Sequence, residues 1–145
     1  MPSSAFYEEV LDSISPPLFH LGSWCLIGGL TALGVLSIYA PATAAAMYGL
    51  PVAVETAWVK VAGLRDIGMA ATALALYRNE PRGMRYFCPA LLMIPLGDAA
   101  LTYALGGTVM GALTHLGGVF AVGALSFFAW KNGELNNDFS YAKKA

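Results

Sequence analysis

Charged residues are scarce in this sequence. Asp, Glu, Lys and Arg make up 12% of its 145 residues, which is about half of the share typical of soluble domains. Apolar residues make up 57%, so too few polar side chains remain to coat a water-facing globule. The scarcity of charge argues against an ordinary soluble domain and favours an integral membrane protein whose main partner is the lipid bilayer.

Motifs for several other functions are also missing. The net charge is −1, and no basic block is interleaved with aromatic residues, so a nucleic acid is not expected as a partner. Cys25 and Cys88 lie in separate apolar segments and give neither a metal-ligand spacing nor a disulfide framework. No phosphate loop, serine elbow or nucleotide-binding motif is readable. We therefore expect no cofactor and no metal ion.

Four apolar segments are long enough to cross a bilayer, which takes about 20 mostly apolar residues. The first and the fourth lack a polar face, which argues against a bundle of soluble helices. The sequence thus predicts an all-α membrane protein, a bundle of four transmembrane helices. The predicted spans are Leu18–Tyr39, Trp58–Tyr77, Tyr86–Leu105 and Val109–Trp130.

Basic residues predict the orientation of this bundle. Those on one predicted side are Arg78, Arg82, Arg85, Lys131, Lys143 and Lys144. Because cytoplasmic segments carry an excess of Lys and Arg, both termini are predicted to be cytosolic. A polar N-terminal segment, 1–17, then precedes the transmembrane domain, 18–130, and a flexible cytosolic tail, 131–145, follows it. For a eukaryotic source, we expect the membrane of the endoplasmic reticulum.

The segment 40–57 is the long predicted connection on the non-cytosolic side. It is expected to form a short Ala-rich helix, Ala42–Tyr48, followed by a turn at Gly49-Leu50-Pro51. This segment either lies in the membrane interface or folds over the bundle as a lid.

Titratable side chains form a predicted polar layer inside the spans. At a rise of 1.5 Å per residue, Arg65, Asp66, Asp98 and His115 all lie roughly 9–12 Å from the non-cytosolic face. Charged groups within spans are costly and usually face the bundle interior, where they mark functional sites. Three helices are therefore predicted to bring these four side chains to one level.

Small or hydroxyl-bearing residues share the helix faces of this polar layer. Residues three or four positions apart lie on the same face of a helix, and small residues let helices approach closely. On that basis Gly63, Thr102 and Gly111 are assigned to substrate binding. Pro95 frees a backbone carbonyl near Leu91, which predicts a kink and a small polar cavity beside the layer.

The sequence resembles a family of small four-span membrane proteins of ascomycete fungi and some bacteria, catalogued as a domain of unknown function. The resemblance covers about residues 20–130. Its motifs are Tyr48-Gly49-Leu50-Pro51, Gly63-Leu64-Arg65-Asp66, Gly97-Asp98 and His115. It implies a shared site but no established reaction. Fungal proteins of this kind look like accessory members of secondary-metabolite pathways, and some assist cyclisation or isomerisation of polyketide- or terpene-derived intermediates.

The first functional hypothesis is a cofactor-independent isomerase or cyclase that acts on a lipophilic small molecule. Asp66 or Asp98 would be the general acid and His115 the partner base. Arg65 would hold a carboxylate or enolate oxygen of the substrate.

Two other functions stay open. In a membrane scaffold, the polar layer would only clamp helices together, and partner enzymes or a second copy of the chain would bind elsewhere. In a small carrier or proton path, an oligomer would be required, because four helices leave little room for a pore.

Overall fold

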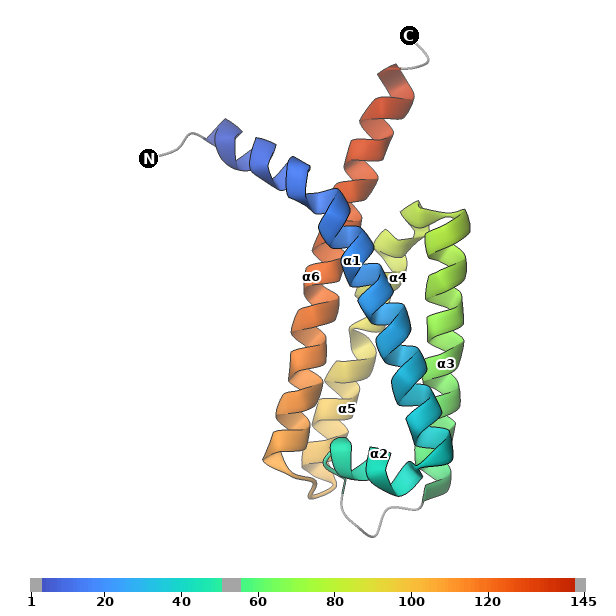
Figure 1. The fold of residues 1–145 in the computed structure, drawn as a ribbon. Coiled ribbons are helices and arrows are strands. Elements are labelled where there is room, and N and C mark those ends of the chain that lie inside the picture. The colour runs from blue at the N-terminus through green and yellow to red at the C-terminus, as the bar shows by residue number, and fades with distance from the viewer. Residues whose placement is uncertain (1–3, 51–55, 143–145) are drawn as a thin grey trace.

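The computed structural model describes residues 4–50 and 56–142, and the side chains of residues 6–50 and 56–133. The described residues form helices and no strand (Figure 1), which confirms the all-α fold class. The elements are α1 (Ser4–Tyr39), α2 (Pro41–Met47), α3 (Thr56–Asn79), the 3-10 helix η1 (Pro81–Gly83), α4 (Met84–Leu91), α5 (Met93–Ala104) and α6 (Val109–Ala142).

Several helices are long and apolar enough to cross a membrane. Within the described residues these are Phe6–Tyr39, Pro81–Ala104 and Val109–Gly133. The chain is therefore a multi-pass membrane protein, as predicted. The second predicted span corresponds to α3 and is not among them, because Lys60, Arg65, Asp66 and Arg78 interrupt its apolar sequence.

The helices form four rods: α1, α3, α4 with α5, and α6 (Figure 1). Packing divides them into two pairs, since α3 lies along α1 while α4 and α5 lie along α6. Glycines bring α1 and α3 close together: a Cβ added to Gly63 would lie 2.7 Å from the carbonyl oxygen of Gly34. Such small residues permit the close helix contacts of membrane proteins.

A hydrophobic core joins the two pairs near the end of the bundle that carries the chain termini. It contains Phe19, Ile27, Ala73, Met84, Cys88, Leu125 and Ala129. Farther from that end, α3 and α5 are not packed along each other within the described part of the chain. The helices are thus packed together by the core at the end that carries the termini, and α3 and α5 are separated farther from that end.

The predicted connection 40–57 folds over the opposite end. α2 crosses that end of the bundle (Figure 1), and the turn after it binds the start of α6. Gly49 has φ of +68°, a conformation that favours glycine, and its carbonyl oxygen accepts a hydrogen bond from the Thr108 amide at 2.9 Å. This arrangement of residues 41–50 fits both the interface and the lid alternatives, while residues 51–55 lie outside the described part.

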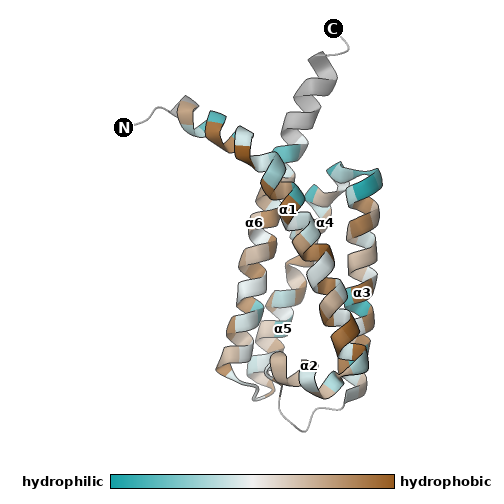
Figure 2. Ribbon diagram, viewed as in Figure 1, coloured by the Kyte–Doolittle hydropathy of each residue, from teal (hydrophilic) through white to brown (hydrophobic). Residues whose placement is uncertain are grey.

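Both termini and the α3–α4 connection lie at the same end of the bundle (Figure 1). Hydrophilic residues gather there (Figure 2), among them Arg78, Arg82, Arg85 and Lys131. Lys143 and Lys144 lie outside the described residues.

Two helices extend beyond the predicted spans. α1 begins at Ser4 and contains Pro16 and Pro17, near which it changes direction (Figure 1), as prolines inside helices do. Residues 131–142 continue α6, and the flexibility expected of the tail 131–145 stays a prediction. No proline follows Pro95 in the sequence, so none stops this helix.

Candidate functional site

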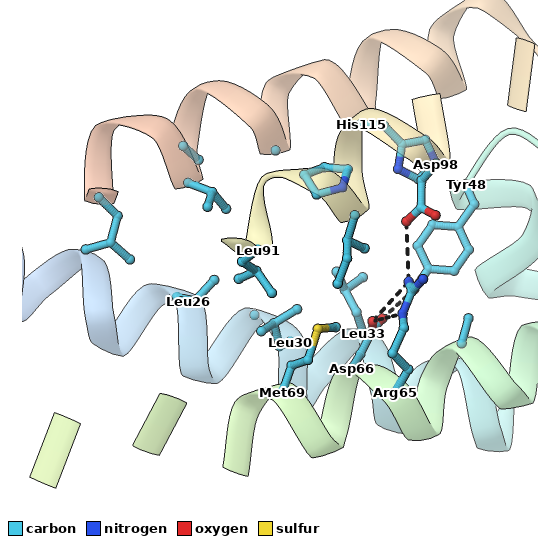
Figure 3. Close-up of a pocket in the computed structure, with 18 of the residues that line it drawn as sticks. Leu26, Leu30, Leu33, Tyr48, Arg65, Asp66, Met69, Leu91, Asp98 and His115 are labelled. Atoms are coloured by element: carbon cyan, nitrogen blue, oxygen red, sulfur yellow. Dashed lines mark hydrogen bonds and ion pairs between the residues drawn. The ribbon is translucent and has the colours of Figure 1, made fainter. Parts of the chain in front are cut away.

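A cavity of about 960 Å³ lies between α1, α3, α5 and α6. Its wall on α1 runs from Leu18 to Leu33, which corresponds to roughly 22 Å of helix. Most lining side chains are apolar, and the polar ones gather at the end nearest α2 (Figure 3). The cavity is therefore a long apolar channel with a polar end.

Arg65 bridges two carboxylates at this polar end. Its Nε and Nη2 atoms donate to Asp66 Oδ1, each at 3.3 Å, and Nη2 also reaches Asp98 Oδ2 at 3.3 Å. Asp66 is buried on α3, whereas Asp98 is partly exposed on α5. The guanidinium thus spans the separation between α3 and α5, the two helices that do not pack along each other.

Tyr48 reaches the same cluster from the turn after α2. Its hydroxyl donates to Asp66 Oδ2 at 3.5 Å and lies 3.1 Å from the Oγ atom of Ser37 on α1. Because the phenol has one hydrogen, which goes to Asp66, Ser37 is the donor to Tyr48. Burial raises the pKa of the Tyr48 phenol above its ordinary value, so the phenol remains a hydrogen-bond donor at neutral pH.

His115 joins the polar end from α6. Its imidazole stacks on the Tyr48 ring, with centroids 5.8 Å apart and an interplanar angle of 24°. No hydrogen bond to either ring nitrogen is found among the described residues, and none is found to Asp98 Oδ1. Both His115 and Asp98 line the cavity, so their open positions are available to a ligand.

The break between α4 and α5 places Asp98. Pro89 and Pro95 flank Leu92, where one helix ends and the next begins. The Leu92 amide binds the Pro89 carbonyl at 3.2 Å, a tighter turn than the α-helical pattern. This is the kink that Pro95 predicts near Leu91, and α5 carries Asp98 after it.

Exposed apolar residues form the edges of the cavity on α3 and α5. Val61 on α3 and Leu101 on α5 both line the cavity and are more than half exposed. In a membrane protein, such side chains face lipid. The cavity therefore reaches the exposed apolar surface between α3 and α5.

The residues assigned to substrate binding fall in different places. Thr102 is buried and lines the cavity. Gly63 packs against α1, and a Cβ on Gly111 would lie 2.6 Å from the Cα of Gly49. Neither Gly63 nor Gly111 lines the cavity, so the structure gives both glycines a packing contact.

Two members of the cluster were missed by sequence reasoning: Tyr48 and Ser37. Tyr48 lies in a connection rather than a span, so a search of the spans for charged groups passes over it. The signal for it was the Tyr48-Gly49 motif of the family resemblance. Ser37 has no such signal, because a serine in an apolar helix commonly binds its own backbone.

The chemistry available at the polar end is proton transfer. Two carboxyl groups, a phenol and an imidazole are all general acids or bases, and they meet at the polar end of the cavity. Arg65 is engaged by both carboxylates through Nε and Nη2, so it positions them, and no contact of its Nη1 atom is found among the described residues. Within residues 4–50 and 56–142, no three His, Cys, Asp or Glu side chains are grouped to hold a metal ion.

Comparison with protein families identifies the relatives of this chain. A family model described as "Domain of unknown function (DUF4267)" matches residues 28–129, which is more than half of the sequence. The chain belongs to the DUF4267 family. The match confirms the resemblance to a family of unknown function, and it contains Tyr48, Arg65, Asp66, Asp98 and His115. Neither the curated proteins nor the solved structures gave a match.

Proposed function

We propose that this DUF4267 protein is a membrane enzyme that takes a long lipophilic molecule from the bilayer and rearranges it by acid–base catalysis. The observation that carries the proposal is the cavity of about 960 Å³, whose apolar wall ends at Arg65, Asp66, Asp98 and His115. Its volume is that of a small-molecule site, and its few polar groups converge at one end, as they do in such sites.

Isomerisation or cyclisation fits the available groups best. A carboxylic acid, Asp98 or Asp66, gives a proton to the substrate, and His115 removes a proton from another position. The proton then passes from His115 back to the carboxylate, so the product has the same composition as the substrate. Such a reaction uses no redox cofactor.

The charged residues also indicate how the bundle is placed in the membrane. α3 is proposed as a fourth span, since its 24 residues correspond to roughly 36 Å and Arg65 is paired with carboxylates inside the bundle. The end that carries both termini and the arginines is proposed to be cytosolic. In a fungus the membrane would be the endoplasmic reticulum and the substrate a secondary-metabolite intermediate.

A deletion strain of the source organism tests the catalytic proposal. Extracts should accumulate a lipophilic compound, and the wild-type gene should restore its product. Genes encoding Asp98→Asn or His115→Ala should fail to restore it at equal protein level. Asp12→Asn is the control, because Asp12 lies at the terminal end near Lys131 Nζ, 3.8 Å away. Full product from both site variants would contradict the proposal.

A scaffold is the second candidate function. The observation in its favour is that Arg65 ties α3 to α5, a role that needs no substrate. In that case the arginines at the terminal end would recruit partner enzymes. Replacing Arg78, Arg82 and Arg85 by Gln, with membrane orientation checked, would then lose both product and partner recovery. Asp98→Asn would lose neither, and this contrast separates the two functions.

A further inference from the structure

The charges at the polar end are unequal. Among the described residues that line the cavity, Arg65 is the only cation, and it faces the two carboxyl groups of Asp66 and Asp98. His115 carries no charge in its neutral form. With both carboxyl groups ionised, the cluster has a net charge of −1, and with one protonated it is neutral.

Acid catalysis changes the cluster from its neutral state, with one carboxyl group protonated, to the state of net charge −1, with both carboxyl groups ionised. When the protonated carboxyl group gives up its proton, a new O–H or C–H bond forms on the substrate and the substrate becomes a cation. The protein is left with two carboxylates and one guanidinium, so the two charges balance. An anionic intermediate would instead face two carboxyl groups and a single guanidinium that is already paired with both of them.

Aromatic rings add to this preference. Tyr48, Trp58 and Phe128 all line the cavity. The face of an aromatic ring attracts cations, and the effect is larger away from water. Of these rings, Tyr48 lies at the polar end beside His115 and Asp66, so its π electrons add to the negative potential of the two carboxylates there.

We infer that the site stabilises a positively charged intermediate, so that its substrate is a long apolar molecule whose epoxide or alkene becomes a cation on protonation. The inference rests on the proposed function and specifies the charge of the intermediate in the proposed reaction. After rearrangement, the cation loses a proton to His115, and that proton returns to the carboxylate. No enolate is formed on this route.

Amines report on the inference, because a protonated amine resembles a cation of this kind. Purified protein in phosphatidylcholine nanodiscs is given N,N-dimethylhexadecylamine, hexadecanol or hexadecanoic acid, three probes with the same chain length. Native mass spectrometry measures the bound fraction of each. We expect the amine to bind at least about tenfold more tightly than the alcohol, the lower end of what close charge pairs contribute, and the acid to bind more weakly than the alcohol.

Variants test whether Asp98 is responsible for the preference for the amine over the alcohol. Asp98→Asn should lower amine binding by about tenfold, the same order as a single close charge pair, and leave alcohol binding unchanged. Asp12→Asn should change neither. The comparison of three probes on the wild-type protein needs no variant, so it stands even where Asp98→Asn folds poorly.

The possible failures are distinguishable. Equal binding of amine and alcohol, or tightest binding of the acid, overturns the inference. The cavity proposal then still holds, provided that Gly29→Leu, which fills the cavity, abolishes binding of the tightest probe. If none of the three probes binds, the proposed function fails and the inference fails with it.

Discussion

Tyr48 stacks on His115 at a centroid distance of 5.8 Å, although the two residues come from the turn after α2 and from the first turns of α6. The same phenol donates to Asp66. One side chain of the connection therefore joins the proposed base, His115, to the Asp66 carboxylate on α3.

Replacing Tyr48 by Phe keeps the stacking and removes the hydroxyl. We expect the free energy of unfolding to fall by about 1–3 kcal/mol, because buried Asp66 and Ser37 both lose a partner. Product formation in the complemented deletion strain should fall as well. Denaturant titration in mixed micelles measures the first effect. Tyr39→Phe is the control, since Tyr39 is highly exposed; equal losses in both variants would refute a role for the hydroxyl.

The Tyr48 phenol also predicts a pH dependence. Burial raises its pKa above the ordinary value of 10.0, so the folded protein favours the neutral phenol. That contribution to stability is complete below the pKa of the unfolded chain and is lost as the pH rises through the folded pKa. The stability difference between wild type and Tyr48→Phe should therefore shrink above about pH 10. A stability difference between the two proteins that stays constant up to about pH 11 would contradict this prediction.

Filling the cavity should block function without unfolding the protein. Gly29 lines the cavity and a Cβ there meets no other atom within 4 Å, so Gly29→Leu projects into the lumen. We expect product formation to fall at least about tenfold with little change in stability, since surface-like substitutions stay within about 0.5 kcal/mol. The adjacent Gly28 has equal space outside the cavity, and Gly28→Leu should keep full activity. Equal activity of both variants would count against a ligand in this cavity.

Arg65→Gln should destabilise the bundle. The substitution leaves buried Asp66 without its guanidinium, and a buried group left without its partner costs about 1–3 kcal/mol. Denaturant titration is the measurement, and Arg78→Gln is the control, because Arg78 is exposed at the end of α3. Combining Arg65→Gln with Asp66→Asn should recover part of the loss. An equally unstable double variant would show that the pairing contributes nothing.

A comparison of two glycines with positive φ distinguishes the cost of backbone strain from the cost of a steric clash. Gly49 has φ of +68° and Gly106 has φ of +74°, so alanine costs about 1–2 kcal/mol at either. A Cβ at Gly49 would lie 2.5 Å from the Gly111 Cα, whereas at Gly106 it meets nothing within 4 Å. Gly49→Ala should therefore be the more destabilising and should alone reduce product formation, by displacing Tyr48. Equal stability losses, each measured by thermal unfolding in detergent, would show that this contact is unimportant.

The sequence predicted the helices and the meeting of Arg65, Asp66 and Asp98 because both follow from one-dimensional quantities. Span length and the 1.5 Å rise were enough to place Arg65, Asp66 and Asp98 at one level. The break at Leu92 followed from the effect of Pro95 on the backbone. None of these predictions required knowledge of which helices are neighbours.

The residue that each small side chain packs against depends on which helices are neighbours. Periodicity put Gly63 on the face of Asp66, but only the fold shows that this glycine contacts Gly34 on α1. Gly111 likewise contacts the turn at Gly49 rather than the cavity. Tyr48 was overlooked as a member of the cluster because its connection folds back over the bundle, and no rule of span length anticipates that contact.

Under the proposed function, entry of the substrate from lipid between α3 and α5 would also determine how that substrate is supplied. A molecule that enters and leaves through lipid never becomes a solute in water, so its supply depends on its amount per area of membrane. An upstream enzyme and a downstream enzyme in the same bilayer can then exchange material with this one by two-dimensional diffusion, without docking to it.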